Sequence, residues 1–209
     1  MAAQALRRSH LTVKTKFNAI IENTQAEGHE QALTFKVPPC RLSSDEFKAK
    51  FGDIYERCEW VAEKILLEGV SEADTSVEHL ASRMKKVVDE AGYDKRLALL
   101  RAHPELQGRL TLTGELSAAS ASEQASAGLY NCSPEEFAQF QRLNARYRAK
   151  FGHPFFLAVR GLTRAEVLEK FAQRVENDAD TEFSNAFQQI HKRARLRLGR
   201  MGKAEVSKL

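Results

Sequence analysis

The sequence has few cysteines and prolines and no long hydrophobic run. Its three cysteines, Cys40, Cys58 and Cys132, lie far apart in 209 residues and form no CxxC pair. This spacing excludes a disulfide framework and a thiolate zinc site, and it predicts reduced, mostly buried thiols. No stretch approaches the roughly eighteen continuous apolar residues that a membrane span needs. We therefore expect a soluble chain that does not insert into a membrane.

An excess of one charge is also missing. The 32 Lys and Arg residues nearly balance the 28 Asp and Glu residues, and the net charge of +4 arises from local excesses near the two ends. A balanced surface attracts polyanions only weakly, so we expect no nucleic-acid partner. Apolar residues make up 43% of the chain, which is enough to fill the core of one globular domain of this length.

Hydrophobic spacing is helical almost throughout the chain. A capping box from Ser43 to Glu46, followed by apolar residues at helical spacing up to Gly69, predicts one long amphipathic helix. Neither strand-like alternation nor an internal repeat is present, and the sequence therefore predicts a single-domain, all-α, multi-helix bundle. Five further helices are expected, over residues 77–90, 94–102, 133–150, 163–177 and 181–198.

Composition divides the chain into three parts. Residues 1–40 are polar and end in Pro38-Pro39, which predicts an N-terminal appendage that is partly disordered. Residues 41–199 form the expected helical domain, and residues 200–209 form a flexible tail. Within the domain, residues 116–128 are rich in alanine and serine. They fit a flexible linker and a closely packed helix that includes Glu123 and Gln124 equally well.

The chain ends in Ser207-Lys208-Leu209. At a free carboxyl terminus this tripeptide is the address that peroxisomal import receptors bind. The polar residues before it predict an accessible tail. We therefore expect a peroxisomal protein that binds the import receptor through these three residues.

Three polar clusters lie in the middle of the chain: HPELQG from His103, SASEQASAGL from Ser120 and NARYRAKFGHPFF from Asn144. Each places titratable or amide groups beside small residues, glycine or proline, an arrangement typical of a closed polar pocket. Taken singly, His103 is interpreted as a helix C-terminal cap and Glu123 as an acid in a first helical turn. None of these residues alone establishes an enzyme.

Taken together, the clusters resemble the signature of the 2-oxo-4-hydroxy-4-carboxy-5-ureidoimidazoline (OHCU) decarboxylase family. The resemblance rests on HPEL with the following QG, on S-x-x-E-Q-x-x-A-G-L, and on L-N-x-x-Y-x-x-K-F-G-x-P-F. The earlier stretch FKAKFGDIYERCEWVAEKI is similar to the family's first helix. The likeness covers roughly residues 40 to 200.

The resemblance implies an all-helical carboxy-lyase, usually a homodimer, that works without metal or organic cofactor. Such an enzyme decarboxylates OHCU stereospecifically to (S)-allantoin, the last step of urate degradation in purine metabolism. The expected peroxisomal address agrees with this independently, because urate oxidation produces hydrogen peroxide and is often housed in that organelle.

The resemblance also implies the site residues. His103 would transfer the proton, because the ordinary pKa of histidine, about 6.5, suits proton transfer near neutral pH. Glu123 would be its catalytic partner, either holding the imidazole or accepting a hydrogen bond from the substrate hydroxyl. The residues expected to bind the substrate are Pro104, Ser120, Ala121, Ser122, Glu123, Gln124, Phe155, Phe156, Leu157, Ala158, Val159 and Arg197, with Arg195 as the alternative to Arg197.

Three positions depart from the family pattern. Glu105 replaces a common Asp, Gln107 replaces a small residue, and His153 takes an apolar aromatic position, where we expect it to point to solvent. None of these changes removes a proposed catalytic group.

Two other functions compete with this assignment. The basic stretch 191–200 is also typical of a helical module that binds nucleic acid, but Leu196 and Leu198 interrupt its charges. A catalytically idle scaffold that keeps the fold is the second alternative. The presence of both His103 and Glu123 argues against the scaffold.

Overall fold

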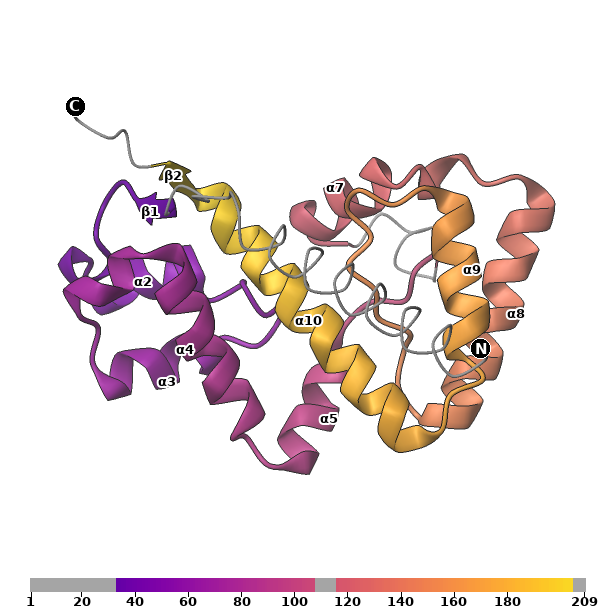
Figure 1. The fold of residues 1–209 in the computed structure, drawn as a ribbon, viewed down its shortest axis with the longest axis horizontal. Coiled ribbons are helices and arrows are strands. Elements are labelled where there is room, and N and C mark those ends of the chain that lie inside the picture. The colour runs from indigo at the N-terminus through magenta and orange to yellow at the C-terminus, as the bar shows by residue number, and fades with distance from the viewer. Residues whose placement is uncertain (1–32, 108–115, 205–209) are drawn as a thin grey trace, which may run out of the picture. The chain divides into compact units, whose positions relative to one another are not determined.

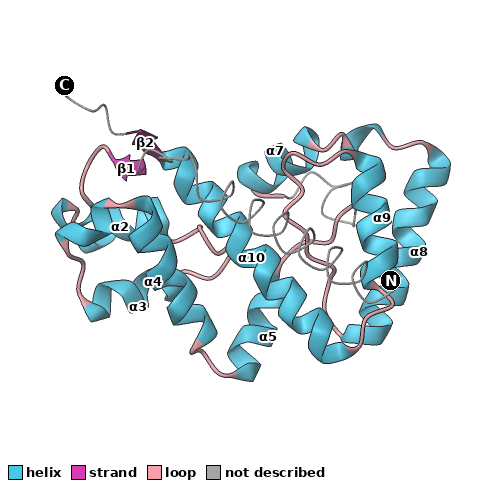
Figure 2. Ribbon diagram, in the orientation of Figure 1, coloured by secondary structure: helices cyan, strands magenta, loops and turns pink. Residues whose placement is uncertain are grey.

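A computed structural model of the chain describes residues 33–107 and 116–204. Over these residues the structure consists of eight α-helices, short 3-10 turns and one pair of short strands (Figures 1 and 2). The prediction of an all-α fold is confirmed. No helix in the described ranges is both long and apolar enough to cross a membrane. Most of the predicted appendage and the Ser207-Lys208-Leu209 tripeptide lie outside the described residues, and the predicted boundaries of the parts stay predictions.

The prediction of one long helix up to Gly69 is wrong, because two helices occupy that stretch. Helix α2, Ser44–Phe51, begins with the expected capping box, and α3, Trp60–Glu68, follows after a turn. Arg57 in this turn has φ 58°, in the left-handed region that an α-helix excludes. The apolar spacing suggests a helix because the turn also buries its hydrophobic side chains, Ile54, Tyr55 and Cys58.

The remaining helices follow the predictions closely, since their ends are encoded by local caps. Ser133, for example, accepts a hydrogen bond from the backbone N–H of Glu136, and Gly152 in the left-handed conformation ends the same helix. These helices are α4 (Val77–Asp89), α5 (Tyr93–Ala102), α7 (Ala118–Ser126), α8 (Pro134–Phe151), α9 (Arg164–Arg174) and α10 (Ala179–Met201).

Helix α7 settles the two interpretations of the stretch rich in alanine and serine. Ser117 caps it by accepting a hydrogen bond from the backbone N–H of Ser120 at 3.2 Å. Gly128 follows in the left-handed conformation, and the 3-10 turn Leu129–Asn131 comes next. This segment is therefore a packed helix rather than a linker.

Two hydrophobic clusters fill the described domain, with the segment after Gly152 between them. Phe156 packs into the first cluster, with α2 to α5 and α10, while Phe155, Leu157 and Val159 pack into the second, with α8 and α9. Alternating sides is the geometry of extended backbone, in which successive side chains point in opposite directions. In Figure 1, helix α10 runs past both groups of helices. The polar clusters of the sequence meet where the two hydrophobic clusters adjoin.

A short antiparallel pair, absent from the sequence-based prediction, joins the beginning and end of the described domain. Strand β1, Leu33–Phe35, pairs with β2, Gly202–Ala204, so that Phe35 lies opposite Gly202. A Cβ on Gly202 would lie 2.6 Å from the side chain of Val77, so only glycine allows this approach. Strands of three residues are too short to show the alternation that identifies a strand in a sequence.

Candidate active site

His103 ends helix α5 and is nearly fully buried. Its backbone is extended, at φ −77° and ψ 143°, as the following Pro104 requires. Its ring nitrogen Nδ1 lies 2.8 Å from the carbonyl oxygen of Leu99, and Phe156 packs edge-on against the ring. Because a carbonyl oxygen only accepts, Nδ1 carries the proton and Nε2 keeps its lone pair. The interpretation of His103 as a cap is confirmed, and the capping bond leaves Nε2 as a proton acceptor.

Burial and charge make His103 a neutral group. Desolvation and the nearby Arg193 guanidinium lower the pKa of His103 to about 3, although the Leu99 carbonyl and Glu56 favour protonation. This result corrects the expectation that the ring keeps an ordinary pKa near neutrality. At neutral pH the imidazole therefore starts a reaction as a proton acceptor.

Glu123 is held by three arginines from one face of helix α10. Its Oε2 accepts a hydrogen bond from Arg193 Nε at 2.7 Å, and its Oε1 accepts from Arg197 Nε at 3.0 Å and from Arg200 Nη2 at 3.3 Å. Residues 193, 197 and 200 share a face because they are four and three positions apart. Of the two roles considered for Glu123, holding the imidazole is not what this structure shows, since Leu99 binds that ring.

Glu56 is a second buried carboxylate in the site, and sequence reasoning missed it. It lies in the turn between α2 and α3 and accepts hydrogen bonds from Ser117 Oγ at 2.6 Å and Ser120 Oγ at 2.7 Å. Burial alone would raise the pKa of Glu56, but Arg193 and the two serines outweigh that effect and lower it to about 2. One signal was available, because Glu56 is an acid inside the family-like stretch FKAKFGDIYERCEWVAEKI.

Arg193 connects the two carboxylates and was also missed. It binds Glu56 and Glu123, donates to Ser120 Oγ at 2.6 Å, and lies over the ring of Phe156. Its sequence signal is a charged residue on the apolar face of a helix, beside Ala194 and three residues after Ile190. The three arginines of α10 and the two carboxylates leave a net charge of +1 in this cluster (3 − 2).

The structure brings most of the predicted substrate-binding residues to one small cavity of about 20 Å³, which we call the polar site. This volume is room for about one water molecule, so the site is closed to a ligand in this conformation. The predicted residues that line it are Pro104, Ser120, Glu123, Gln124, Phe155, Phe156, Leu157 and Val159, and the additional ones are Leu106 and Arg193.

Four predicted residues do not line this cavity. Ser122 is exposed, Ala121 is half-buried, and the Ala158 N–H faces the Gln189 side-chain oxygen at 3.4 Å. Arg197 is buried and reaches the polar site through Glu123. Its alternative, Arg195, is exposed and pairs with Glu78 at 2.6 Å, so the structure favours Arg197.

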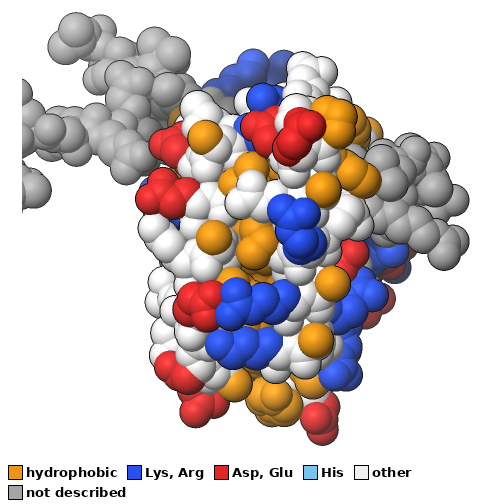
Figure 3. Space-filling model, turned by 90° about the vertical axis from the view of Figure 1, so that its right-hand side faces the viewer, with side chains coloured by type: hydrophobic (Ala, Val, Ile, Leu, Met, Phe, Trp, Pro, Cys, Tyr) orange, Lys and Arg blue, Asp and Glu red, His pale blue; other side chains and the backbone are white. Residues whose placement is uncertain are grey.

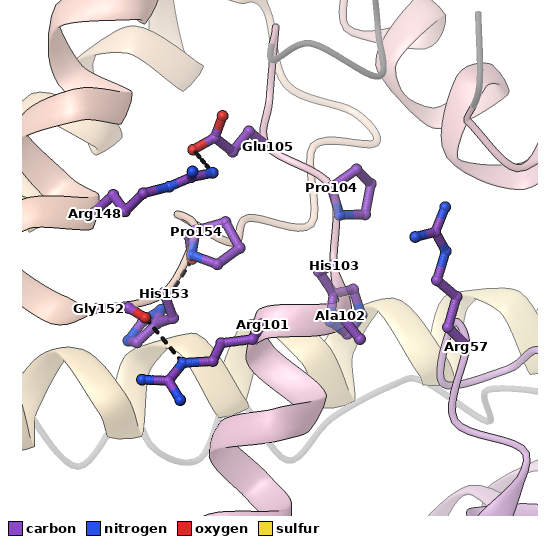
Figure 4. Close-up of a pocket in the computed structure, with 10 residues that line it drawn as sticks. All are labelled: Arg57, Arg101, Ala102, His103, Pro104, Glu105, Arg148, Gly152, His153 and Pro154. Atoms are coloured by element: carbon purple, nitrogen blue, oxygen red, sulfur yellow. Dashed lines mark hydrogen bonds and ion pairs between the residues drawn. The ribbon is translucent and has the colours of Figure 1, made fainter.

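A larger cavity of about 400 Å³ adjoins the polar site and shares Pro104 with it. His103 lines this larger cavity rather than the polar site, together with several arginines (Figure 4). The larger cavity holds only two of the predicted residues, whereas the polar site holds the buried carboxylate of Glu123 and the guanidinium of Arg193. We therefore place the chemistry at the polar site.

Two side-chain amides of α8, the buried Asn144 and the exposed Gln141, fix the chain between His103 and Gln107. Asn144 Nδ2 donates to the Leu106 carbonyl at 2.8 Å, and Gln141 Nε2 donates to the Gln107 carbonyl at 2.7 Å. His153 is buried as well, at 3% exposure, which contradicts the expectation that it points to solvent. Its ring packs edge-on against Tyr147, so histidine fills this aromatic position as an aromatic would.

Charges elsewhere argue against a nucleic-acid-binding module. Arg193 and Arg197 of the basic last helix point inward, and Arg195 and Arg200 pair with acids. On the face that includes α8 and α9, Lys and Arg side chains alternate with acidic and hydrophobic ones (Figure 3). Over the described ranges, no group of three or more His, Cys, Asp or Glu side chains is placed to hold a metal ion. All three cysteines are free thiols, with Cys58 buried and the other two half-buried.

Comparison with known proteins gives a consistent result. A family model described as OHCU decarboxylase matches residues 40–199. The 2-oxo-4-hydroxy-4-carboxy-5-ureidoimidazoline decarboxylase of Haloferax volcanii is 42% identical over 158 residues, covering 76% of this chain and 90% of that protein. The protein of the same name from Mus musculus is 33% identical, covering 73% of this chain and 84% of the relative.

Two solved structures share the fold. A crystal structure of (S)-allantoin synthase superposes with a TM-score of 0.63 at 32% identity, covering 78% of this chain and 52% of that one. The present chain thus spans about half the length of that protein. A crystal structure of OHCU decarboxylase in the presence of (S)-allantoin gives a TM-score of 0.56 at 22% identity, covering 75% of this chain and 96% of that one.

Proposed function

This chain belongs to the OHCU decarboxylase family, and we propose that it converts 2-oxo-4-hydroxy-4-carboxy-5-ureidoimidazoline to (S)-allantoin and carbon dioxide in urate degradation. It is accordingly a carboxy-lyase. The observation that carries the proposal is the neutral, buried His103 next to a closed polar site that contains Glu123 and Arg193. The family resemblance supplies the substrate, and the geometry supplies roles for the residues.

The substrate's name defines the reaction. It places a hydroxyl and a carboxylate on ring carbon 4 and a ureido group on carbon 5, where the imidazoline ring has its C=N bond. When the bond to the carboxylate breaks, its electron pair forms a double bond between carbons 4 and 5, and the C=N pair moves to nitrogen, which takes a proton. The resulting enol loses its hydroxyl proton and gains a proton at carbon 5. Carbon dioxide leaves, and one proton is consumed overall.

His103 suits the two proton transfers. Its free Nε2 can take the proton of the 4-hydroxyl, and once protonated the ring is a strong acid because its pKa is low. It can then return the proton to carbon 5 from the face on which the ring lies. A fixed imidazole therefore accounts for a single stereoisomer of the product.

The other polar groups stabilise charge and orient the ring. Arg193, which lines the polar site, and Arg197, which reaches it through Glu123, would stabilise the negative charge that develops on the substrate. Glu123 would hold these guanidinium groups in position, and Gln124 has both a donor and an acceptor for the ureido group. The backbone of residues 155–159 would contribute amides and carbonyls on the opposite edge.

The proposal is tested by generating OHCU in situ from urate with a urate oxidase and a hydroxyisourate hydrolase, and following circular dichroism. The spontaneous reaction gives optically inactive allantoin, so a rapid dichroic signal that depends on this protein reports the activity. His103→Asn should abolish that signal while keeping the helical spectrum in the far ultraviolet. Near-normal rates in the variant would remove His103 from the mechanism. A folded wild-type protein without a signal would favour the idle scaffold.

We also propose a homodimer, as the family resemblance implies. Large apolar side chains that are exposed in the single chain support it, notably Leu67 at 84% and Tyr93 at 64% exposure. Sedimentation velocity should give about twice the chain mass of 23.5 kDa. A species at the mass of one chain, at micromolar concentration, would contradict the dimer.

Peroxisomal localisation is proposed from Ser207-Lys208-Leu209. Its support is the position of this tripeptide at the end of the chain and the place of the reaction after urate oxidation.

A further inference from the structure

The larger cavity beside His103 is strongly basic, and we call it the arginine cavity. Three arginines and one glutamate contribute its formal charges, which sum to +2 (3 − 1). Burial lowers the pKa of both of its histidines, so neither adds charge at neutral pH. Its lining residues are Arg57, Arg101, Ala102, His103, Pro104, Glu105, Arg148, Gly152, His153 and Pro154.

Arg57 is placed in this cavity by a strained backbone. Its φ of 58° is uncommon for a residue other than glycine, and a hydrogen bond from its N–H to Asp53 Oδ1 at 3.3 Å supports the turn. Among the described residues, its guanidinium has neither a hydrogen-bond acceptor nor an acidic partner. The fold therefore maintains a strained turn that presents a positive charge without an acidic partner in residues 33–107 and 116–204.

Arg101 presents a second group of free donors from the end of α5. Its Nε donates to the Gly152 carbonyl at 3.1 Å, which fixes the side chain, and over the described ranges its two Nη groups have no acceptor. Arg148, by contrast, is paired with Glu105. Figure 4 shows Arg57 on one side of His103 and Pro104, and Arg101 with Arg148 on the other.

We propose that the arginine cavity is an entry site for a carboxylate-bearing cyclic ureide, with the positive charges of Arg57 and Arg101 attracting the carboxylate. This inference rests on the proposed function for the identity of the ligand. The arginine cavity has about 400 Å³, enough for such a molecule, whereas the polar site has about 20 Å³. Pro104 lines both cavities, so a ligand held in the larger one waits beside the site at which it reacts. Guanidinium groups bind carboxylates through paired N–H donors.

Binding of two stable compounds tests the entry site directly. Orotate is a cyclic ureide with a carboxylate, and uracil is its counterpart without one. By isothermal titration calorimetry, Arg57→Gln and Arg101→Gln should each weaken orotate binding roughly tenfold, the effect of losing one charge-assisted hydrogen bond. Neither should change uracil binding. The matched control is Arg142→Gln on α8, an exposed arginine outside the cavity, which should bind orotate like the wild type.

Kinetics separates the entry site from the proposed function. Arg57→Gln should lower kcat/KM for OHCU several-fold at low ionic strength and much less in 0.5 M NaCl, because salt screens an exposed charge. If the protein has no decarboxylase activity but binds orotate in a way that depends on Arg57, the entry site is supported and the proposed function is refuted. An active enzyme in which both arginine variants bind orotate normally and keep their kcat/KM would overturn the entry site alone.

Discussion

Arg193 donates its Nε–H to Glu123 across 2.7 Å, although the two residues are 70 positions apart in the chain. The same guanidinium binds Glu56, so one side chain of α10 links two carboxylates that come from a turn and from α7. A buried ion pair that loses one partner leaves an uncompensated charge, which destabilises a protein far more than the pair stabilises it. The folding of the site is therefore tied to this arginine.

Replacing Arg193 should destabilise the whole domain. Arg193→Met keeps much of the side-chain volume but removes the guanidinium that hydrogen-bonds both Glu56 and Glu123, and we expect the free energy of unfolding to fall by roughly 3 kcal/mol. Urea denaturation followed by circular dichroism measures the change. In the double variant Glu56→Gln/Arg193→Met one of the buried charges is gone, so part of the loss should return. Additive losses in the double variant would show that the two side chains do not interact.

Replacing Arg197 and replacing Arg195, two arginines of α10, should have very different effects on the activity. Arg197 is buried against Glu123, whereas Arg195 is exposed and paired with Glu78. We expect Arg197→Gln to lower kcat/KM for OHCU by roughly a hundredfold, the effect of losing a buried charge-assisted contact. Arg195→Gln, the matched control, should remain within about twofold of the wild type. The reverse order would show that Arg195 is the ligand-binding residue.

Stability should decline at mildly acidic pH because of His103. Its pKa is about 3 in the folded protein and about 6.5 in an unfolded chain, so the unfolded state binds more protons between these values. The contribution is fully present above pH 6.5 and is lost as the pH falls toward 3. At pH 5 the stability lost in this way amounts to about 2 kcal/mol. Free energies of unfolding measured at pH 7 and pH 5 give the change of stability with pH.

The variant His103→Asn supplies the comparison for this pH effect. Without the titrating ring, the loss of stability between pH 7 and pH 5 should become smaller by about the same 2 kcal/mol. The pKa values of His153 and His191 are also lowered by burial, so a residual slope should remain. An identical pH dependence in variant and wild type would mean that His103 titrates normally in the folded protein.

Removal of Leu209 should redirect the protein in the cell. Import receptors read the last three residues together with the free carboxylate, so a chain that ends at Lys208 lacks the address. With a fluorescent protein fused to the N-terminus, the full chain should give punctate peroxisomal fluorescence and the truncated chain a diffuse cytosolic signal. Unchanged puncta in the truncated form would refute targeting by this tripeptide.

The helices that were predicted well begin and end at signals in the residues next to their ends. The capping box of Ser133 and Glu136 and the terminal Gly152 act within one or two turns, so the sequence alone contains the information for α8. The break between α2 and α3 was missed because Ile54 and Tyr55 are buried from a turn at positions that also suit a helix. Tertiary burial overrides periodicity there.

The site residues also fall into those that local motifs predict and those that long-range contacts bring together. The family motifs contain His103, Glu123 and the residues around them, and the structure places most of these together at the polar site. Glu56 lies inside the family-like stretch FKAKFGDIYERCEWVAEKI, but its pairing with Arg193 depends on a contact between residues 137 positions apart. No local pattern encodes a contact of that range. His153 was misplaced because a polar residue in an aromatic position was expected to prefer water.

The hydrogen bond between Leu99 and His103 gives the last turn of α5 a chemical role. That carbonyl is one of the unsatisfied acceptors at a helix end, and the ring that satisfies it is thereby committed to a single tautomer. Fraying of this turn would free the ring to exchange its two nitrogens, so that the atom facing the reactant would sometimes bear hydrogen instead of a lone pair. In the proposed mechanism, helix propensity at positions 99–102 therefore controls how often the His103 ring is in the competent tautomer.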